Sequence, residues 1–158
     1  MLWPMKTNPA DLALLDTNIL VYAEQRRQPQ HEAAKMLRDR ALRGEIPACI
    51  SPQVLSEFFA VITRFGGAPL SSQEAVDEVK KYYRAKRLVK IYPGTNIIER
   101  VLALLEAHPV TGLNIHDLHL VATMLENNVT KIYTFNVRHF APFSGIEVLT
   151  PPEPQLTP

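Results

Sequence analysis

The fold of this chain is decided by the stretch Leu12-Ala13-Leu14-Leu15-Asp16-Thr17-Asn18-Ile19-Leu20-Val21. Its first four residues are all apolar, as expected of a strand that is covered on both faces of a parallel sheet. The polar residues that follow predict a turn that leads directly into a helix. Asp16 is the only charged residue within positions 12–23.

Asp16 has two interpretations. An ionised carboxylate is costly to place among apolar groups unless something compensates its charge. At the carboxyl end of a parallel strand the compensation is often a ligand, because open α/β sheets bind their ligands there. The alternative is that Asp16 or Thr17 simply caps the helix that follows. This stretch alone supports both interpretations.

Outside this stretch, short apolar strands alternate with amphipathic helices. We expect strands at 12–15, 46–50, 88–92, 131–134 and 146–149, and helices at 17–24, 31–43, 52–65, 71–86, 95–107 and 114–126. This alternation predicts a single α/β domain over residues 1–158, with a mainly parallel central sheet of about five short strands flanked by helices. We expect a loose arm at 1–9 and a disordered, proline-rich tail at 151–158.

The composition is that of a globular protein without a strong overall attraction to nucleic acid or membranes. The chain has 158 residues, 46% of them hydrophobic, and a formal net charge of +1, so any basic surface must be local. The single cysteine, Cys49, lies in an apolar run and predicts a core residue in a reducing compartment. Without a secretion signal or a membrane-length apolar run, we expect a cytoplasmic protein with no membrane partner.

Two further carboxylates share the isolation of Asp16. Glu57 is the only charge within residues 46–63, and Asp117 is the only formally charged side chain within residues 107–125. The helix neighbours of Glu57 carry no charge, so none is expected to pair with it: Gln53, Val54, Ala60 and Val61. For Asp117 the alternative is a capping box over residues 114–117, in which the acid complements the helix dipole.

Of these three isolated acids, Asp16 follows a strand, Glu57 lies within a helix and Asp117 begins a helix. Such positions can converge at one edge of an α/β sheet. Converging carboxylates repel one another unless a cation or a proton joins them. Oxygen ligands suit Mg²⁺ or Mn²⁺, and the sequence has no Cys/His cluster that would indicate zinc. A cation held by carboxylates is the usual equipment for phosphodiester chemistry, because it polarises the phosphate and activates a bound water.

The order of these motifs resembles the PIN domain, a family of metal-dependent ribonucleases, over residues 12–149. The resemblance rests on four stretches in chain order: Leu14-Leu15-Asp16-Thr17-Asn18, Ser56-Glu57, Asp117-Leu118-His119-Leu120-Val121-Ala122 and Tyr133-Thr134-Phe135-Asn136-Val137-Arg138-His139-Phe140. In its small size and its lack of appended domains, the chain most resembles the VapC-type toxins of bacterial and archaeal toxin–antitoxin pairs.

The resemblance implies that Asp16 and Asp117 bind Mg²⁺ or Mn²⁺ directly. Glu57 would act in the same cluster, either on the metal or by orienting a metal-bound water. The fourth position is often Asp in the family and is Asn136 here. An amide oxygen can bind a metal or a water but brings no charge, so the resemblance leaves open whether one metal or two are bound.

Polar neighbours complete the implied site. Thr17 and Thr134 would place hydroxyl groups near the metal, and Asn18 would brace the loop. His116 and His119 flank Asp117, and each has two interpretations, a metal ligand or an ordinary helix residue. A haloacid-dehalogenase-type phosphatase would need a second acid where Asn18 stands, so that reaction class is set aside.

Residues 80–87 contain five bases and two aromatic residues without an acid. Helical spacing would place Lys81, Arg84 and Arg87 on one side, where they could bind RNA phosphates while an aromatic ring stacks on a base. The alternative is a solvated helix end whose bases complement the helix dipole.

Together, the residues and the resemblance predict a metal-dependent endoribonuclease that hydrolyses RNA phosphodiesters as the toxin of a toxin–antitoxin pair. Its expected partners are an RNA substrate, a protein antitoxin and, by analogy with PIN toxins, a second copy of itself. Two alternatives remain: an RNA-processing PIN nuclease without an antitoxin, and a catalytically silent PIN-like module that binds RNA or protein. Asn136 is the feature that favours the silent module.

Overall fold

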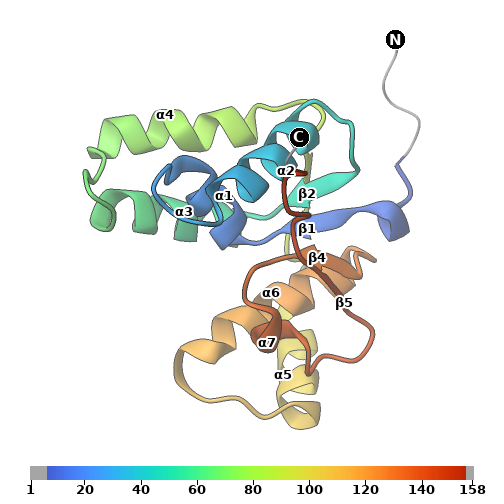
Figure 1. The fold of residues 1–158 in the computed structure, drawn as a ribbon. Helices are drawn as coiled ribbons and strands as arrows, with labels where there is room; N and C mark the ends of the chain where they lie inside the picture. Colours follow the sequence, from blue (N-terminus) through green and yellow to red (C-terminus); the bar gives the residue numbers. More distant parts are fainter. Residues whose placement is uncertain (1–6, 156–158) are drawn as a thin grey trace.

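A parallel sheet of five short strands organises the computed structural model, which describes residues 7–155 (Figure 1). The strands are β1 Ala13–Leu15, β2 Ala48–Ile50, β3 Val89–Lys90, β4 Lys131–Tyr133 and β5 Glu147–Leu149. Every pairing is parallel, and the strand order is β3-β2-β1-β4-β5. The predicted α/β fold with a parallel central sheet is therefore confirmed.

Seven α-helices and two short 3₁₀ helices connect these strands in the described residues. The α-helices are α1 Thr17–Glu24, α2 His31–Leu42, α3 Pro52–Arg64, α4 Ser72–Tyr83, α5 Ile97–Ala107, α6 Ile115–Glu126 and α7 Val137–Phe140, and the 3₁₀ helices are η1 Pro9–Asp11 and η2 Gly112–Asn114. Figure 1 shows α1 to α4 on one side of β1 and α5 to α7 on the other. Helices thus cover both faces of the sheet, as a parallel sheet requires.

β1 is the central strand of the sheet, and its side chains are apolar throughout. Ala13, Leu14 and Leu15 are at most 3% exposed, and Leu14 and Leu15 pack in one core with residues from all the larger helices. The chain moves from β1 to β2 and β3 on one side and later returns to β4 and β5 on the other. The carboxyl ends of β1 and β4 therefore lie where the direction of strand addition reverses, which is where open α/β sheets bind ligands.

Local sequence signals fix the starts of the two helices that follow β2. Ser51 caps α3 through its hydroxyl, with Pro52 at the first helical position. Ser71 and Glu74 form a reciprocal capping box at the start of α4, as the sequence predicts. α3 and α4 then pack against each other, as do α5 and α6. These pairs place Glu57, in α3, and Asp117, in α6, on opposite sides of β1.

Some expected boundaries were wrong. The helix expected at 71–86 ends at Tyr83, because the chain turns through residues 84–88 to enter β3. The helix α7 was not predicted at all. Of the expected loose arm, residues 1–6 lie outside the described residues and Pro9 begins η1, and of the expected tail, residues 156–158 lie outside them. No helix within residues 7–155 combines the length and the apolar character needed to cross a membrane.

Candidate metal centre at the carboxyl edge of the sheet

Asp16 is the first residue after β1, and the residue is only 7% exposed. Its Oδ1 accepts a hydrogen bond from the Thr17 N–H at 2.8 Å, so it does cap α1 as the alternative interpretation held. Its Oδ2 accepts from the Thr134 hydroxyl at 2.7 Å and from the Asn18 amide at 3.2 Å. Capping therefore uses only one of the two carboxylate oxygens, and the other one meets the end of β4.

Burial dominates the electrostatics of Asp16 and raises the pKa of its carboxyl from 3.8 to about 6. The hydrogen bonds from Thr134 and Thr17 lower this pKa, whereas the negative charges of Asp117 and Glu57 raise it. Within the described part of the chain, Asp16 has hydrogen-bond donors but no salt bridge. Its charge is thus costly in this position, as expected of a group that a cation would stabilise.

Glu57 faces the same region from α3, and both of its carboxylate oxygens accept hydrogen bonds. The Thr17 hydroxyl donates to Oε2 at 2.8 Å, and the Gln53 amide donates to Oε1 at 2.9 Å. The expectation that no helix neighbour pairs with Glu57 was wrong, because a neutral amide four residues away can also donate to a carboxylate. Thr17 links Glu57 to Asp16, since its N–H binds one acid and its hydroxyl the other.

Asp117 lies in the first turn of α6, and its Oδ2 is 2.8 Å from Nδ1 of His139. The capping-box interpretation was wrong, because Asn114 makes no capping hydrogen bond through its side chain. Burial raises the pKa of Asp117, and the contact with His139 acts in the opposite direction. Sequence reasoning missed His139, although it lies in the fourth of the stretches on which the resemblance rests.

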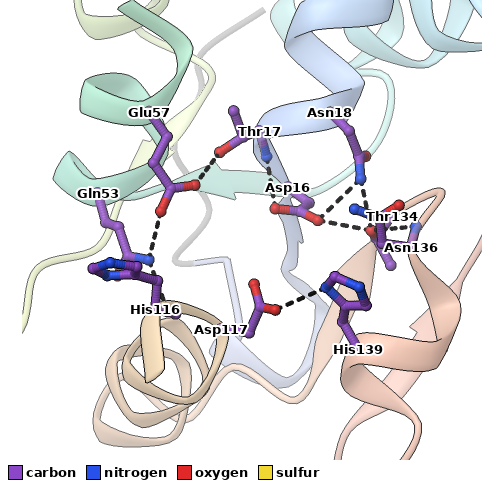
Figure 2. Close-up of polar contacts among 10 residues, drawn as sticks. All are labelled: Asp16, Thr17, Asn18, Gln53, Glu57, His116, Asp117, Thr134, Asn136 and His139. Atoms are coloured by element: carbon purple, nitrogen blue, oxygen red, sulfur yellow. Dashed lines mark hydrogen bonds and ion pairs between the residues drawn. The ribbon is translucent and has the colours of Figure 1, made fainter. Parts of the chain in front are cut away.

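Asn18 and Thr134 join the start of α1 to the end of β4 (Figure 2). The Asn18 amide donates to the Thr134 hydroxyl at 3.1 Å, and its Oδ1 accepts from the Phe135 N–H at 3.2 Å. Thr134 in turn accepts from the N–H of Asn136 at 2.9 Å. These contacts fix the loop after β4. Asn136 takes part through its backbone N–H, and its exposed side chain makes none of these contacts. A metal-binding role for Asn136 stays a prediction.

Figure 2 shows Asp16, Glu57 and Asp117 facing a common space from β1, α3 and α6. Thr17 is hydrogen-bonded to both Asp16 and Glu57, whereas Asp117 contacts His139. Within residues 7–155, no three Asp, Glu, His or Cys side chains form a ready-made metal cluster. The three carboxylates nevertheless fit a hard divalent cation, because such cations prefer oxygen ligands. The negative charges of Asp117 and Glu57 also raise the pKa of the buried Asp16, as expected of acids that a cation between them would stabilise. Their assignment as ligands stays a prediction.

The predicted RNA-binding bases lie at a different edge of the sheet. Arg87 precedes β3, and its guanidinium donates to the carbonyl of Arg43, which lies shortly before β2 begins. Because the strands are parallel, these positions are at the amino edge, whereas Asp16 is at the carboxyl edge. Lys81 forms an ion pair with Glu78 at 2.6 Å. The structure therefore does not bring these bases together with the carboxylates, and their role in RNA binding stays a prediction.

The sequence of this chain is similar to a known family and to several of its members. The family model of the PIN domain matches residues 13–143 of this chain. Ribonuclease VapC24 of Mycobacterium tuberculosis is 29% identical over 144 residues, which are 87% of this chain and 94% of the relative. VapC ribonuclease Mb2897 of Mycobacterium bovis is 30% identical over 118 residues, which are 73% of this chain and 80% of the relative.

Solved structures with similar folds include VapC20 of Mycobacterium tuberculosis, described as a sarcin–ricin loop cleaving toxin. It matches 82% of this chain and 93% of its own, with a TM-score of 0.63 and 17% identity. A toxin–antitoxin complex from Klebsiella pneumoniae matches 89% of this chain and 98% of its own, with a TM-score of 0.58 and 23% identity. At identities of 17% and 23%, the similarity to these two structures shows the fold alone.

Proposed function

The chain belongs to the PIN domain family, and from this membership we propose that it is a metal-dependent endoribonuclease that acts as the toxin of a toxin–antitoxin pair. The relatives that match most of its length are named VapC ribonucleases. The observation that carries the proposal is Asp16, a buried carboxylate with neutral donors around it and two further carboxylates nearby.

Asp16 and Asp117 would hold Mg²⁺ or Mn²⁺, and Glu57 would act on the same ion or on a water bound to it. When bound, the cation would polarise the RNA phosphate, lower the pKa of a water and neutralise developing charge. The chain's own polar groups orient these acids before any ion arrives. Thr134 and Asn18 fix one oxygen of Asp16, and Thr17 fixes one oxygen of Glu57. Such preorganisation lowers the cost of assembling the site.

The partners follow from the same comparison. VapC20 is described as cleaving the sarcin–ricin loop, which supports RNA as the substrate class here. The complex from Klebsiella pneumoniae contains a toxin with its antitoxin, which supports a protein antitoxin as partner. A homodimer in the cytoplasm is the arrangement we propose for the free toxin. An RNA-processing nuclease without an antitoxin is distinguished by the absence of a small antitoxin gene beside this one.

Cleavage of RNA in the presence of Mn²⁺ tests the proposal directly. Asp16→Ala and Asp117→Ala should abolish cleavage while circular dichroism shows a retained fold, because each removes a ligand and leaves the hydrophobic core untouched. Asp77→Ala is the matched control, since Asp77 is an exposed acid on α4. Full activity in either variant would remove that residue from the mechanism, and a wild type inactive with both Mg²⁺ and Mn²⁺ would refute the nuclease.

Asn136 favours one second candidate, a silent module that binds RNA without cleaving it. Its amide occupies the position where the family often has a fourth acid, so one negative charge is missing from the cluster. The same experiment separates the two functions, because a silent module would retain RNA in a binding assay under conditions in which neither cation produces cleavage.

A further inference from the structure

Gln53 connects the two helices that carry Glu57 and Asp117. Its side-chain amide donates to Oε1 of Glu57 at 2.9 Å and to the backbone carbonyl of His116 at 2.8 Å (Figure 2). The first contact lies within α3, four residues along the helix. The second crosses 63 positions of sequence to the first turn of α6. One amide group therefore bridges the opposite walls of the candidate metal centre.

Both contacts use the same nitrogen, which has two N–H groups to donate. Glu57 is then held on two sides, because its other oxygen accepts the hydroxyl of Thr17 from α1. The carbonyl of His116 belongs to the residue directly before Asp117, so its tether also restrains the backbone that carries Asp117. Hydrogen bonds that orient metal ligands commonly determine the metal affinity of a site.

We propose that Gln53 is a positioning residue that holds Glu57 and the first turn of α6 in the mutual arrangement required to bind a divalent cation. This inference rests on the proposed function, since it assumes that the carboxylates bind a metal. It gives Gln53 a role that depends on both of its contacts. An ordinary helix-surface glutamine would contact only its own helix or solvent.

The neutrality of Gln53 is consistent with this role. A lysine at this position would also reach Glu57, but its positive charge would neutralise the carboxylate and oppose a cation nearby. A glutamine orients the same carboxylate and leaves its full negative charge available. Gln53 is half-buried, so solvent competes less with its hydrogen bond to Glu57 than it would at an open surface, whereas its contact with the His116 carbonyl is exposed.

Gln53→Met tests the proposal, because methionine has a similar length and helix propensity but no N–H group to donate. Mn²⁺ binding is measured by titration calorimetry on the RNA-free protein, together with the Mn²⁺ dependence of RNA cleavage. We expect the dissociation constant for Mn²⁺ to rise about tenfold or more. The maximal cleavage rate at saturating Mn²⁺ should stay close to that of the wild type, because all the ligands are still present.

Gln73→Met provides a matched control on the neighbouring helix α4. Gln73 donates to Asp77 four residues along its own helix, at 3.4 Å and in an exposed position, without a second element to hold. The Gln73→Met variant should bind Mn²⁺ with the same dissociation constant as the wild type. Amide hydrogen exchange supplies a readout independent of metal, because Gln53→Met should speed exchange in the first turns of α6 while the thermal midpoint changes little.

The outcomes separate the two proposals. If the wild type binds Mn²⁺ and Gln53→Met binds it equally well, Gln53 is not a positioning residue, although the proposed function stands. If Gln53→Met loses thermal stability and its Mn²⁺ affinity changes no more than that of Gln73→Met, the role is purely structural and the inference is refuted. If the wild type itself does not bind Mn²⁺, the proposed function fails and this inference fails with it.

Discussion

Replacing Asp16 by Asn should stabilise the metal-free protein at neutral pH. The substitution keeps the shape of the side chain and an oxygen that can accept from the Thr17 N–H, and it removes the negative charge. That charge is unfavourable because burial, above all, raises the pKa of Asp16 from 3.8 to about 6. A bound cation would reverse this preference, because it would stabilise the ionised carboxylate.

The sign of the pH effect follows from proton binding. Between about pH 4 and pH 6 the folded state keeps a proton on Asp16 that the unfolded state has released, so stability falls as the pH rises through this window. Each pKa unit corresponds to about 1.4 kcal/mol, so the wild type loses about 3 kcal/mol by pH 7. Asp16→Asn avoids this loss, but its NH₂ group replaces the oxygen that accepts from both Thr134 and Asn18. Losing these two hydrogen bonds costs about 2 kcal/mol.

We therefore expect a net gain of about 1 kcal/mol at pH 7.5, or a rise of about 2–4 °C in the thermal midpoint. Thermal and urea denaturation in EDTA measure it for the wild type, Asp16→Asn and the exposed control Asp77→Asn. The advantage of Asp16→Asn should shrink as the pH falls and reverse below about pH 5, where the lost hydrogen bonds outweigh the charge that the wild type no longer carries. Equal or lower stability of Asp16→Asn at neutral pH, with parallel pH curves, would refute the reasoning.

Two further predictions concern the metal and the RNA. Mn²⁺ at about a hundred times its dissociation constant should stabilise the wild type by about 2.7 kcal/mol and raise its thermal midpoint accordingly. The same Mn²⁺ concentration should raise the thermal midpoint of Asp117→Asn much less. Equal rises in the two proteins would show that Asp117 is not a ligand. Replacing Lys81, Arg84 and Arg87 together by Ala should weaken RNA binding and flatten its salt dependence, as measured by affinity at low and moderate salt. Parallel salt curves would mean that these bases form a solvated face.

The sheet could be predicted from sequence because its central strand has an unambiguous composition. Leu12 to Leu15 are apolar without alternation, which fits only an element buried on both faces, and β1 pairs with β2 and β4 on its two sides. The isolated acids were equally informative, since a carboxylate far from other charges in sequence needs a partner from elsewhere. Helix ends were less predictable, as the early end of α4 at Tyr83 shows, because the path of the chain into β3 decides them.

The polar partners of the acids could not be found in this way. Gln53 reaches His116 across 63 positions, and His139 reaches Asp117 across 22, so neither contact leaves a local signal. The pairing of Gln53 with Glu57 does leave a local signal, because the two residues are four positions apart on one helix. Gln53 carries no charge, so a pattern of opposite charges does not show this pair. Similarly, helical spacing groups Arg84 with Arg87, yet only the sheet determines that Arg87 lies at the amino edge.

These partners are the reason that the site can be both stable and suited to a cation. Donors around Asp16 and Glu57 come from Thr17, Asn18, Gln53 and Thr134, which are neutral, so they orient the acids and leave the negative charges in place. Compensation by lysine or arginine would have made the fold more stable and the site less attractive to a metal. The protein thus retains an electrostatic cost at the end of β1, and the divalent cation that we propose for this site would remove that cost on binding.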